Sequence, residues 1–357
     1  MKVEKGRIGI LVVLLLCPFV VLARATATDA PTPMPAAKGT ATPSLKRSGV
    51  LPFGNVAPPS GEHWQLTFDD EFRHDTAINP NLWNTQGSGG MPMCHQSGPI
   101  ECGYVFGEDC LGYAGGVINT PSECDPNPTG TLADGNSWYD LIGSGALQMM
   151  PGLSTLVSDN YGEAAWAGVQ NFGHFSQTYG YFEWFAQLPD TTNGRADGYH
   201  SDLWCTSNLR QTVIPFGANC PACVEFDVNE WTGSPANANS TSFGLWDWQG
   251  GPDSVLLSYF NYGVSSGNLH STYHRYAVNW KNTGVGFGTL QLYVDGTPVG
   301  AESPPLSGSA WGSGVYCFAG WIEEMFGQSF NGGLPLDSNT STNNPLNVRY
   351  FRAWQAQ

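Results

Sequence analysis

The sequence predicts an all-β fold, an antiparallel sandwich or barrel. Short runs rich in Val, Tyr, Phe and Trp are separated by Gly, Asn, Asp and Pro, and several of these runs alternate apolar and polar residues. The chain shows no internal repeat and no helical pattern longer than about two turns. Many short strands with turn residues between them are typical of a sandwich or barrel.

The chain opens with a segment typical of a signal peptide. Lysine and arginine residues precede the apolar run Ile8–Ala23, and Ala23 and Ala25 are small residues at the two positions that a signal peptidase reads. We therefore expect residues 1–25 to be removed and the protein to be secreted. The alternative is an uncleaved membrane anchor, since the run approaches the shorter end of the length that spans a bilayer.

The folded domain is expected to begin after a linker. Residues 26–60 are rich in Pro, Ala, Thr and Ser and contain few large apolar side chains, a composition typical of a linker or disordered leader. All 13 Trp lie in residues 61–357, which we take as one domain.

Within this domain, several segments carry the strand pattern. They are Gly180–Leu188, Val224–Glu230, Tyr273–Trp280, Thr289–Asp295 and Asn347–Trp354. The dipeptide Asp295-Gly296 is a hairpin turn signal. The region Gly87–Asn136, rich in Gly, Pro and Cys, predicts a long loop, and loops of that length are usually functional.

The composition excludes some partners. The chain has 14 Lys and Arg against 30 Asp and Glu, a net charge of −16. Because binding to a polyphosphate needs clustered Lys and Arg, we expect no nucleic acid partner. No later segment is apolar enough to span a bilayer, so we expect no membrane partner once the leader is cleaved.

The cysteines outside the leader indicate structural disulfides. They are even in number and belong to a chain expected to be exported: Cys94, Cys102, Cys110, Cys124, Cys205, Cys220, Cys223 and Cys317. Sequence does not choose among their pairings. For Cys220 and Cys223 the alternatives are half a zinc site or a redox pair, but the partners that either would need are not evident.

The acidic run Val224–Glu230 is the most informative part of the chain. Glu225 and Asp227 point to one face of a strand, because side chains alternate. Glu230 joins them only if a β-bulge near Val228 inserts one extra residue, and bulges are common beside active sites. Such a row provides the two carboxylates that a retaining glycosidase needs, and the middle acid would hold them in place and separate their pKa values. The alternatives are a chance cluster of acids or a calcium site.

A series of motifs through residues 61–357 resembles glycoside hydrolase family 16, in its laminarinase-like form. The motifs follow one another along the chain as Trp64–Phe72, Ile78–Trp83, Ala167–Gln170, Tyr179–Pro189, Ser201–Trp204, Glu225–Glu230, His274–Trp280, Leu292–Gly296 and Val348–Gln355. The resemblance implies a β-jelly-roll sandwich of two antiparallel sheets whose concave sheet forms a glycan-binding cleft.

The resemblance also implies residue roles. Glu225 would be the nucleophile, Asp227 the supporting acid and Glu230 the general acid/base of a retaining, endo-acting glycanase. We expect a monomer without cofactor, acting on a β-1,3- or mixed β-1,3-1,4-glucan. A neutral galactan hydrolase, a transglycosylase of the same family and a non-catalytic glycan-binding protein are the alternatives. The scarcity of Lys and Arg disfavours sulfated galactans.

The chain departs from the family pattern in two places. Many members carry a His on the strand after the catalytic one, where this chain reads Phe243–Trp248. Many also bind a structural calcium with an Asp on the final strand, where Arg349 stands here. A cation in place of a ligand argues against a metal at the acidic run Asp69–Glu71. We expect instead a salt bridge from Arg349 to Asp70 or Glu71.

Aromatic residues supply candidate sugar platforms, because a flat ring suits the apolar face of a pyranose. Trp204 and Trp231 flank the catalytic strand in the family pattern and are the first candidates. The further candidates are Trp138, Trp184 and Arg195, the last on a Gly-rich loop. For any single Trp, packing in the core is the competing interpretation.

Overall fold

The computed structural model describes residues 49–72, 79, 81–83, 92–95, 101–104, 113–114, 117–118, 139–142, 145–149, 163–171, 173–208, 224–247, 255–263, 268–325, 339–341 and 344–357. Within these ranges the chain forms strands and short 3-10 helices and no α-helix, which confirms the predicted all-β class. No helix in the described part of the chain is long and apolar enough to cross a bilayer. The expected signal peptide lies outside the described residues.

The first large sheet has eight strands, in the order β16-β15-β14-β9-β18-β7-β6, and β1 pairs with the edge of β18 beyond β7. All its pairings are antiparallel. The strands are β1 (Trp64–Asp70), β6 (Tyr139–Ile142), β7 (Ala146–Met149), β9 (Gly180–Gln187), β14 (His274–Lys281), β15 (Thr289–Val294), β16 (Thr297–Val299) and β18 (Leu346–Ala356).

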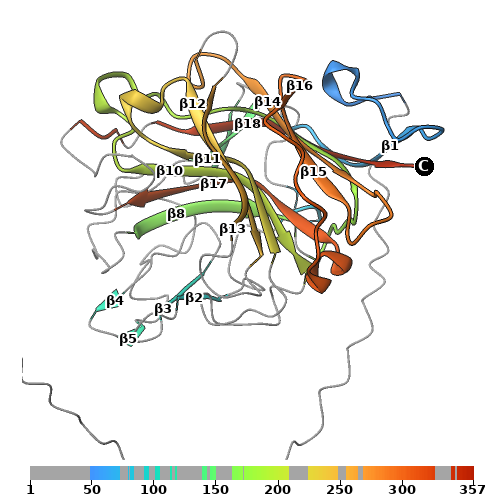
Figure 1. Cartoon of the computed structure of the whole chain (residues 1–357). Coiled ribbons are helices and arrows are strands. Elements are labelled where there is room, and N and C mark those ends of the chain that lie inside the picture. The colour runs from blue at the N-terminus through green and yellow to red at the C-terminus, as the bar shows by residue number, and fades with distance from the viewer. Residues whose placement is uncertain are drawn as a thin grey trace, which may run out of the picture. The chain divides into compact units, whose positions relative to one another are not determined.

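The second sheet has six antiparallel strands in the order β13-β12-β11-β10-β17-β8, which lie side by side in Figure 1. They are β8 (Glu163–Gln170), β10 (Tyr199–Ser207), β11 (Val224–Thr232), β12 (Ser240–Asp247), β13 (Val255–Gly263) and β17 (Val315–Met325). The chain passes repeatedly between the two sheets, so many neighbours are distant in sequence, as in the expected jelly roll.

The remaining elements are small. The hairpins β2 (Pro92–His95) with β3 (Glu101–Tyr104) and β4 (Tyr113–Ala114) with β5 (Val117–Ile118) belong to the predicted long loop, whose other residues lie outside the described ranges. The 3-10 helices are η1 (Phe53–Asn55), η3 (Thr192–Gly194), η5 (Pro235–Asn237) and η7 (Ser309–Ser313).

The two sheets enclose one apolar core. From β11 the side chains of Val224, Phe226 and Val228 are fully buried in it, and the Phe226 ring lies 5.9 Å from that of Phe182 on β9 of the opposite sheet. Burying such a side chain stabilises the fold by about 1.5–3 kcal/mol. This burial fixes which face of β11 points inward, and therefore which face carries its acids.

An N-terminal strap, residues 49–59, packs on the outer face of the eight-stranded sheet. The Trp354 indole N–H donates to the carbonyl of Val50 at 2.8 Å, and Val50 and Val56 pack against a small apolar cluster on that face. The predicted linker 26–60 therefore ends too late, because its last residues are part of the folded domain.

The predicted salt bridge of Arg349 is wrong. The Arg349 guanidinium lies over the ring of Tyr273, 4.0 Å from its centroid. Asp70 accepts a hydrogen bond from the Trp83 indole at 2.5 Å. Arg352 takes the place that we assigned to Arg349.

Arg352 stands opposite Asp69 in the pairing of β1 with β18, which explains the difference. Its Nε donates to Asp69 Oδ1 at 2.7 Å, and its Nη2 donates to Glu71 Oε1. The three side chains are little exposed. Arg352 thus pairs with two of the three carboxylates in the acidic run that most resembled a calcium site.

One disulfide of the expected framework is present and joins Cys205 to Cys317, a pairing that the sequence left open; the two cysteines are paired positions of β10 and β17. Cys94 and Cys102 are paired positions of the β2–β3 hairpin. The other cysteines of the predicted framework lie outside the described residues.

Candidate active site

The three acids of β11 lie on the outer face of the six-stranded sheet. The three residues are largely buried: Glu225 is 8% exposed, Asp227 3% and Glu230 7%. In the pairing with β12, Asp227 faces Gly244 and Glu230 faces Ser242. Three steps along β11 thus correspond to two along β12, which is the predicted β-bulge.

The pairing with β10 identifies the extra residue. Leu203 faces Asn229 and the next residue, Trp204, faces Asp227, so Val228 has no partner on β10. The Val228 side chain is fully buried in the core. After the bulge, Trp231 is the residue that enters the core, and Glu230 is left on the face of the other acids.

A tryptophan holds the middle acid. Trp246 on β12 donates its indole N–H to Asp227 Oδ2 at 2.6 Å. The position between them is Gly244, where an added Cβ would lie 2.9 Å from Asp227 Oδ2 and closer still to Trp246 Nε1. Only a residue without a side chain lets the indole reach the carboxylate. Neither residue was among the predicted site residues, although both fall in the segment that departs from the family pattern.

A histidine lies beside the last acid. His200 Nε2 on β10 is 3.9 Å from Glu230 Oε1, a charge-pair distance that is too long for a hydrogen bond. Asp202, two residues along β10, is the paired position of Glu230. The signal that could have found His200 is its alternation with Trp204, since both are even-numbered positions of a strand whose Leu203 and Cys205 face the core.

Trp204 lies next to the acids, as predicted. It is the paired position of Asp227, and its ring stacks on Phe318 with centroids 4.0 Å apart and planes within 6°. Trp321 meets it edge-on at 6.0 Å. These rings form an aromatic wall beside the carboxylates, and contact of Trp204 with a sugar stays a prediction.

The other predicted platforms lie elsewhere. Trp184 and Trp231 are fully buried, and their indole N–H groups donate to the carbonyls of Phe318 and Asn237. No sugar can stack on a ring packed between two sheets, so neither Trp184 nor Trp231 can be a sugar platform. Trp138 lies outside the described residues.

Arg195 lies in the loop between η3 and β10. Its side chain is 44% exposed, and Nη1 is 3.4 Å from Asp190 Oδ2. Its carbonyl accepts hydrogen bonds from the backbone N–H of Ser341 and the side-chain amide of Asn344, which tie the loop to the chain near β18. A contact between Arg195 and substrate stays a prediction.

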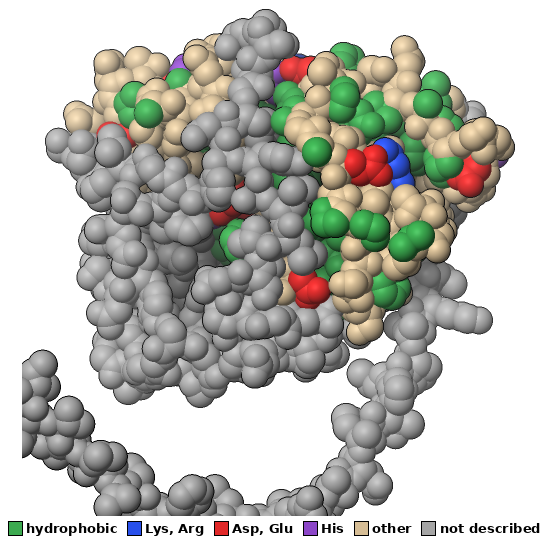
Figure 2. All heavy atoms as spheres, viewed as in Figure 1, with side chains coloured by type: hydrophobic (Ala, Val, Ile, Leu, Met, Phe, Trp, Pro, Cys, Tyr) green, Lys and Arg blue, Asp and Glu red, His purple; other side chains and the backbone are tan. Residues whose placement is uncertain are grey.

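The site is acidic and the described surface around it has few cations. Lys and Arg form no continuous patch among the described residues of the face drawn in Figure 2. In the same part of the chain, no group of three or more His, Cys, Asp and Glu is arranged to hold a metal ion. The arrangement therefore offers carboxylates, a hydrogen-bonded central acid and an aromatic wall.

Solved enzymes that cleave polysaccharides share this jelly-roll sandwich. An endo-1,3-β-glucanase from Streptomyces sioyaensis matches with a TM-score of 0.52 and 19% identity, over 84% of this chain and 98% of that one. SCLam, a non-specific endo-β-1,3(4)-glucanase from family GH16, matches with a TM-score of 0.51 and 15% identity, over 84% and 94%.

A further match is an endo-β-galactosidase from Clostridium perfringens, with a TM-score of 0.51 and 17% identity over 82% of this chain and 63% of that one. No family model matches the sequence, and no curated protein matches it. The chain thus has the laminarinase-like fold of glycoside hydrolase family 16, as the sequence motifs predict.

Proposed function

We propose that the protein is a secreted, endo-acting β-glycanase that cleaves a β-1,3- or mixed β-1,3-1,4-glucan with retention of configuration. The observation that carries the proposal is the row of Glu225, Asp227 and Glu230, brought to one face by the bulge at Val228. The fold shared with two endo-β-glucanases supports it.

The proposed reaction is a double displacement. Glu225 attacks the anomeric carbon while Glu230 protonates the leaving glycosidic oxygen, and a glycosyl-enzyme ester forms. Glu230 then removes a proton from the water that releases the sugar. Asp227 lies between these two residues on the strand, and the hydrogen bond from Trp246 fixes its orientation. It thereby keeps the nucleophile and the acid/base in register with one sugar ring.

The proposed substrate is a neutral glycan. Polyanionic glycans are bound by cationic subsites, and Lys and Arg are scarce in this chain. The aromatic wall at Trp204 suits the apolar face of a pyranose ring. The similar endo-β-galactosidase makes a neutral galactan the first alternative substrate to test.

The proposal includes export. The leader has the features of a signal peptide, and the Cys205–Cys317 disulfide suits an oxidising compartment. We propose that the mature protein acts outside the cell as a monomer and needs no cofactor.

The test measures reducing ends released from laminarin, lichenan, agarose and carrageenan. We expect release from laminarin or lichenan, a fall of at least about 10³-fold in Glu225→Gln, and no change in Glu62→Gln, the same substitution at an exposed position. The first product detected by NMR should be the β-anomer. Absence of release from every polymer, with equal binding by wild type and Glu225→Gln, would leave a glycan-binding module instead.

A further inference from the structure

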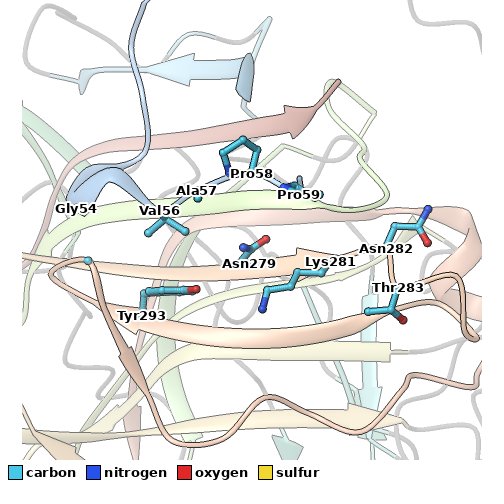
Figure 3. A pocket seen from close by; sticks show the side chains of 11 residues that line it. Gly54, Val56, Ala57, Pro58, Pro59, Asn279, Lys281, Asn282, Thr283 and Tyr293 are labelled. Carbon is cyan, nitrogen blue, oxygen red and sulfur yellow. The ribbon is translucent and has the colours of Figure 1, made fainter. Parts of the chain in front are cut away.

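A cavity of about 460 Å³ lies on the outer face of the eight-stranded sheet, which is not the sheet that carries the acids. We call it the strap groove, because the N-terminal strap forms one wall and β14 and β15 form the floor. Figure 3 shows Val56 and Pro58 of the strap across from Asn279, Lys281 and Tyr293. Its volume falls within the range of small-molecule sites, roughly 300–1,000 Å³.

The lining combines an apolar wall with polar groups. Val56 and Pro58 present aliphatic carbon, while Asn279, Thr283 and Tyr293 bring an amide and two hydroxyls to the same space. A molecule that fits both parts must carry an apolar face and hydroxyl groups together. A pyranose ring has this character.

Asn279 supplies an independent sign of a ligand. It is 3% exposed, yet among the described residues its side-chain amide has no hydrogen-bond partner. The adjacent amide of Gln291, its paired position on β15, donates to the carbonyls of Leu292 and Val299. The Asn279 amide lies toward the groove in Figure 3, where a ligand or water can reach it.

The charge of the groove indicates a neutral ligand. Lys281 Nζ is 2.7 Å from Glu302 Oε2, so its positive charge is already balanced. Tyr293 is held by Tyr181, whose ring centroid is 5.8 Å away, and its ring is only partly buried. Because the Tyr293 ring is already held in place, a sugar that binds against it costs the protein little conformational entropy.

We propose that the strap groove is a second glycan-binding site, which holds a neutral segment of a polysaccharide away from the acids of β11. That this polysaccharide is also the substrate rests on the proposed function. A second point of attachment raises the effective concentration of chain at the catalytic face, because the protein then dissociates only when both contacts are lost.

The test counts sites. In the Glu225→Gln background, calorimetric titration with a β-1,3-linked glucose hexasaccharide should give two sites, the groove with a Kd of about 1 mM or tighter. Adding Asn279→Leu should remove one site. Because no hydrogen bond of the protein is lost, this variant should unfold at the same urea concentration as its parent. Tyr293→Ala is the second variant if Asn279→Leu does not fold.

The outcomes separate this inference from the proposed function. Two sites reduced to one support both. One site in the parent that Asn279→Leu abolishes supports the groove but contradicts glucan binding at the acids. An unchanged number of sites in both variants, or no binding in the parent to this hexasaccharide or to a neutral agarose hexasaccharide, would overturn the groove.

Discussion

Replacing Trp246 by Phe tests how the central acid is held. The substitution keeps an aromatic ring but removes the N–H that donates to Asp227 Oδ2 at 2.6 Å. A hydrogen bond to a charged group contributes about 1.5–3 kcal/mol. If this whole amount is lost in the transition state, kcat/KM falls about 10- to 150-fold. We expect the loss mainly in kcat, because in the proposed mechanism Asp227 positions the two reacting carboxylates and does not bind distant sugar units.

Gly244→Ala should produce the same loss by another route. The added methyl group occupies the space that the Trp246 indole crosses, so the indole must move away from Asp227. Because both substitutions break one contact, the double variant should lose no more than the worse single variant. Losses that add in the double variant would show that the two residues act independently.

The assay is kcat/KM on the polymer that wild type cleaves best, with urea unfolding of each variant. Trp311→Phe is the matched control, because it makes the same chemical change at a buried indole N–H without a hydrogen-bond partner among the described residues. It should lower stability through a cavity and leave kcat unchanged. Wild-type kcat/KM in a folded Trp246→Phe protein would refute the positioning role.

Two further predictions concern stability. Arg352→Met leaves two little-exposed carboxylates without their cation and should lower the free energy of unfolding by about 3–5 kcal/mol. Arg349→Met removes only a cation–π contact and should lower it by about 1 kcal/mol or less. Equal losses of the two variants in urea unfolding would contradict this prediction. Burial opposes ionisation of Asp295, but hydrogen bonds from His274 and the Arg275 N–H outweigh it and lower its pKa. The ionised Asp295 therefore stabilises the fold above its unfolded pKa of about 4, and this stabilisation is lost as the pH falls through its folded pKa. The variant Asp295→Asn should therefore lose less stability than wild type on acidification. Parallel curves of unfolding free energy against pH for the two proteins would exclude this.

The acid row could be predicted because it depends on one strand. Alternation alone separates Glu225 and Asp227 from the apolar residues of β11, and the position of Glu230 then requires a bulge. The Trp246 contact could not be predicted in this way. It joins two strands and exists only because Gly244 leaves space, and neither fact appears in the spacing of either segment.

The errors have a common physical origin. The identity of an aromatic residue does not distinguish a core ring from an exposed platform, and Trp184 and Trp231 face inward because their neighbours set the strand orientation. The N-terminal strap has only a few apolar side chains, too few to suggest folded structure by composition. Its order comes from the sheet that it covers, which is formed by residues far along the chain.

The bulge at Val228 determines which residues of β11 share a face with the acids. Before it, odd-numbered positions of β11 point toward the acids' face, and after it even-numbered ones do. Removing one residue between Asp227 and Glu230 would abolish the bulge, and plain alternation would then still place Glu230 on the acids' face and Trp231 in the core. A regular strand of the present length would instead turn Glu230 into the core and Trp231 to the surface, so the extra residue and the bulge are needed together. An attempt to transplant the site must therefore move the strand as an undivided segment.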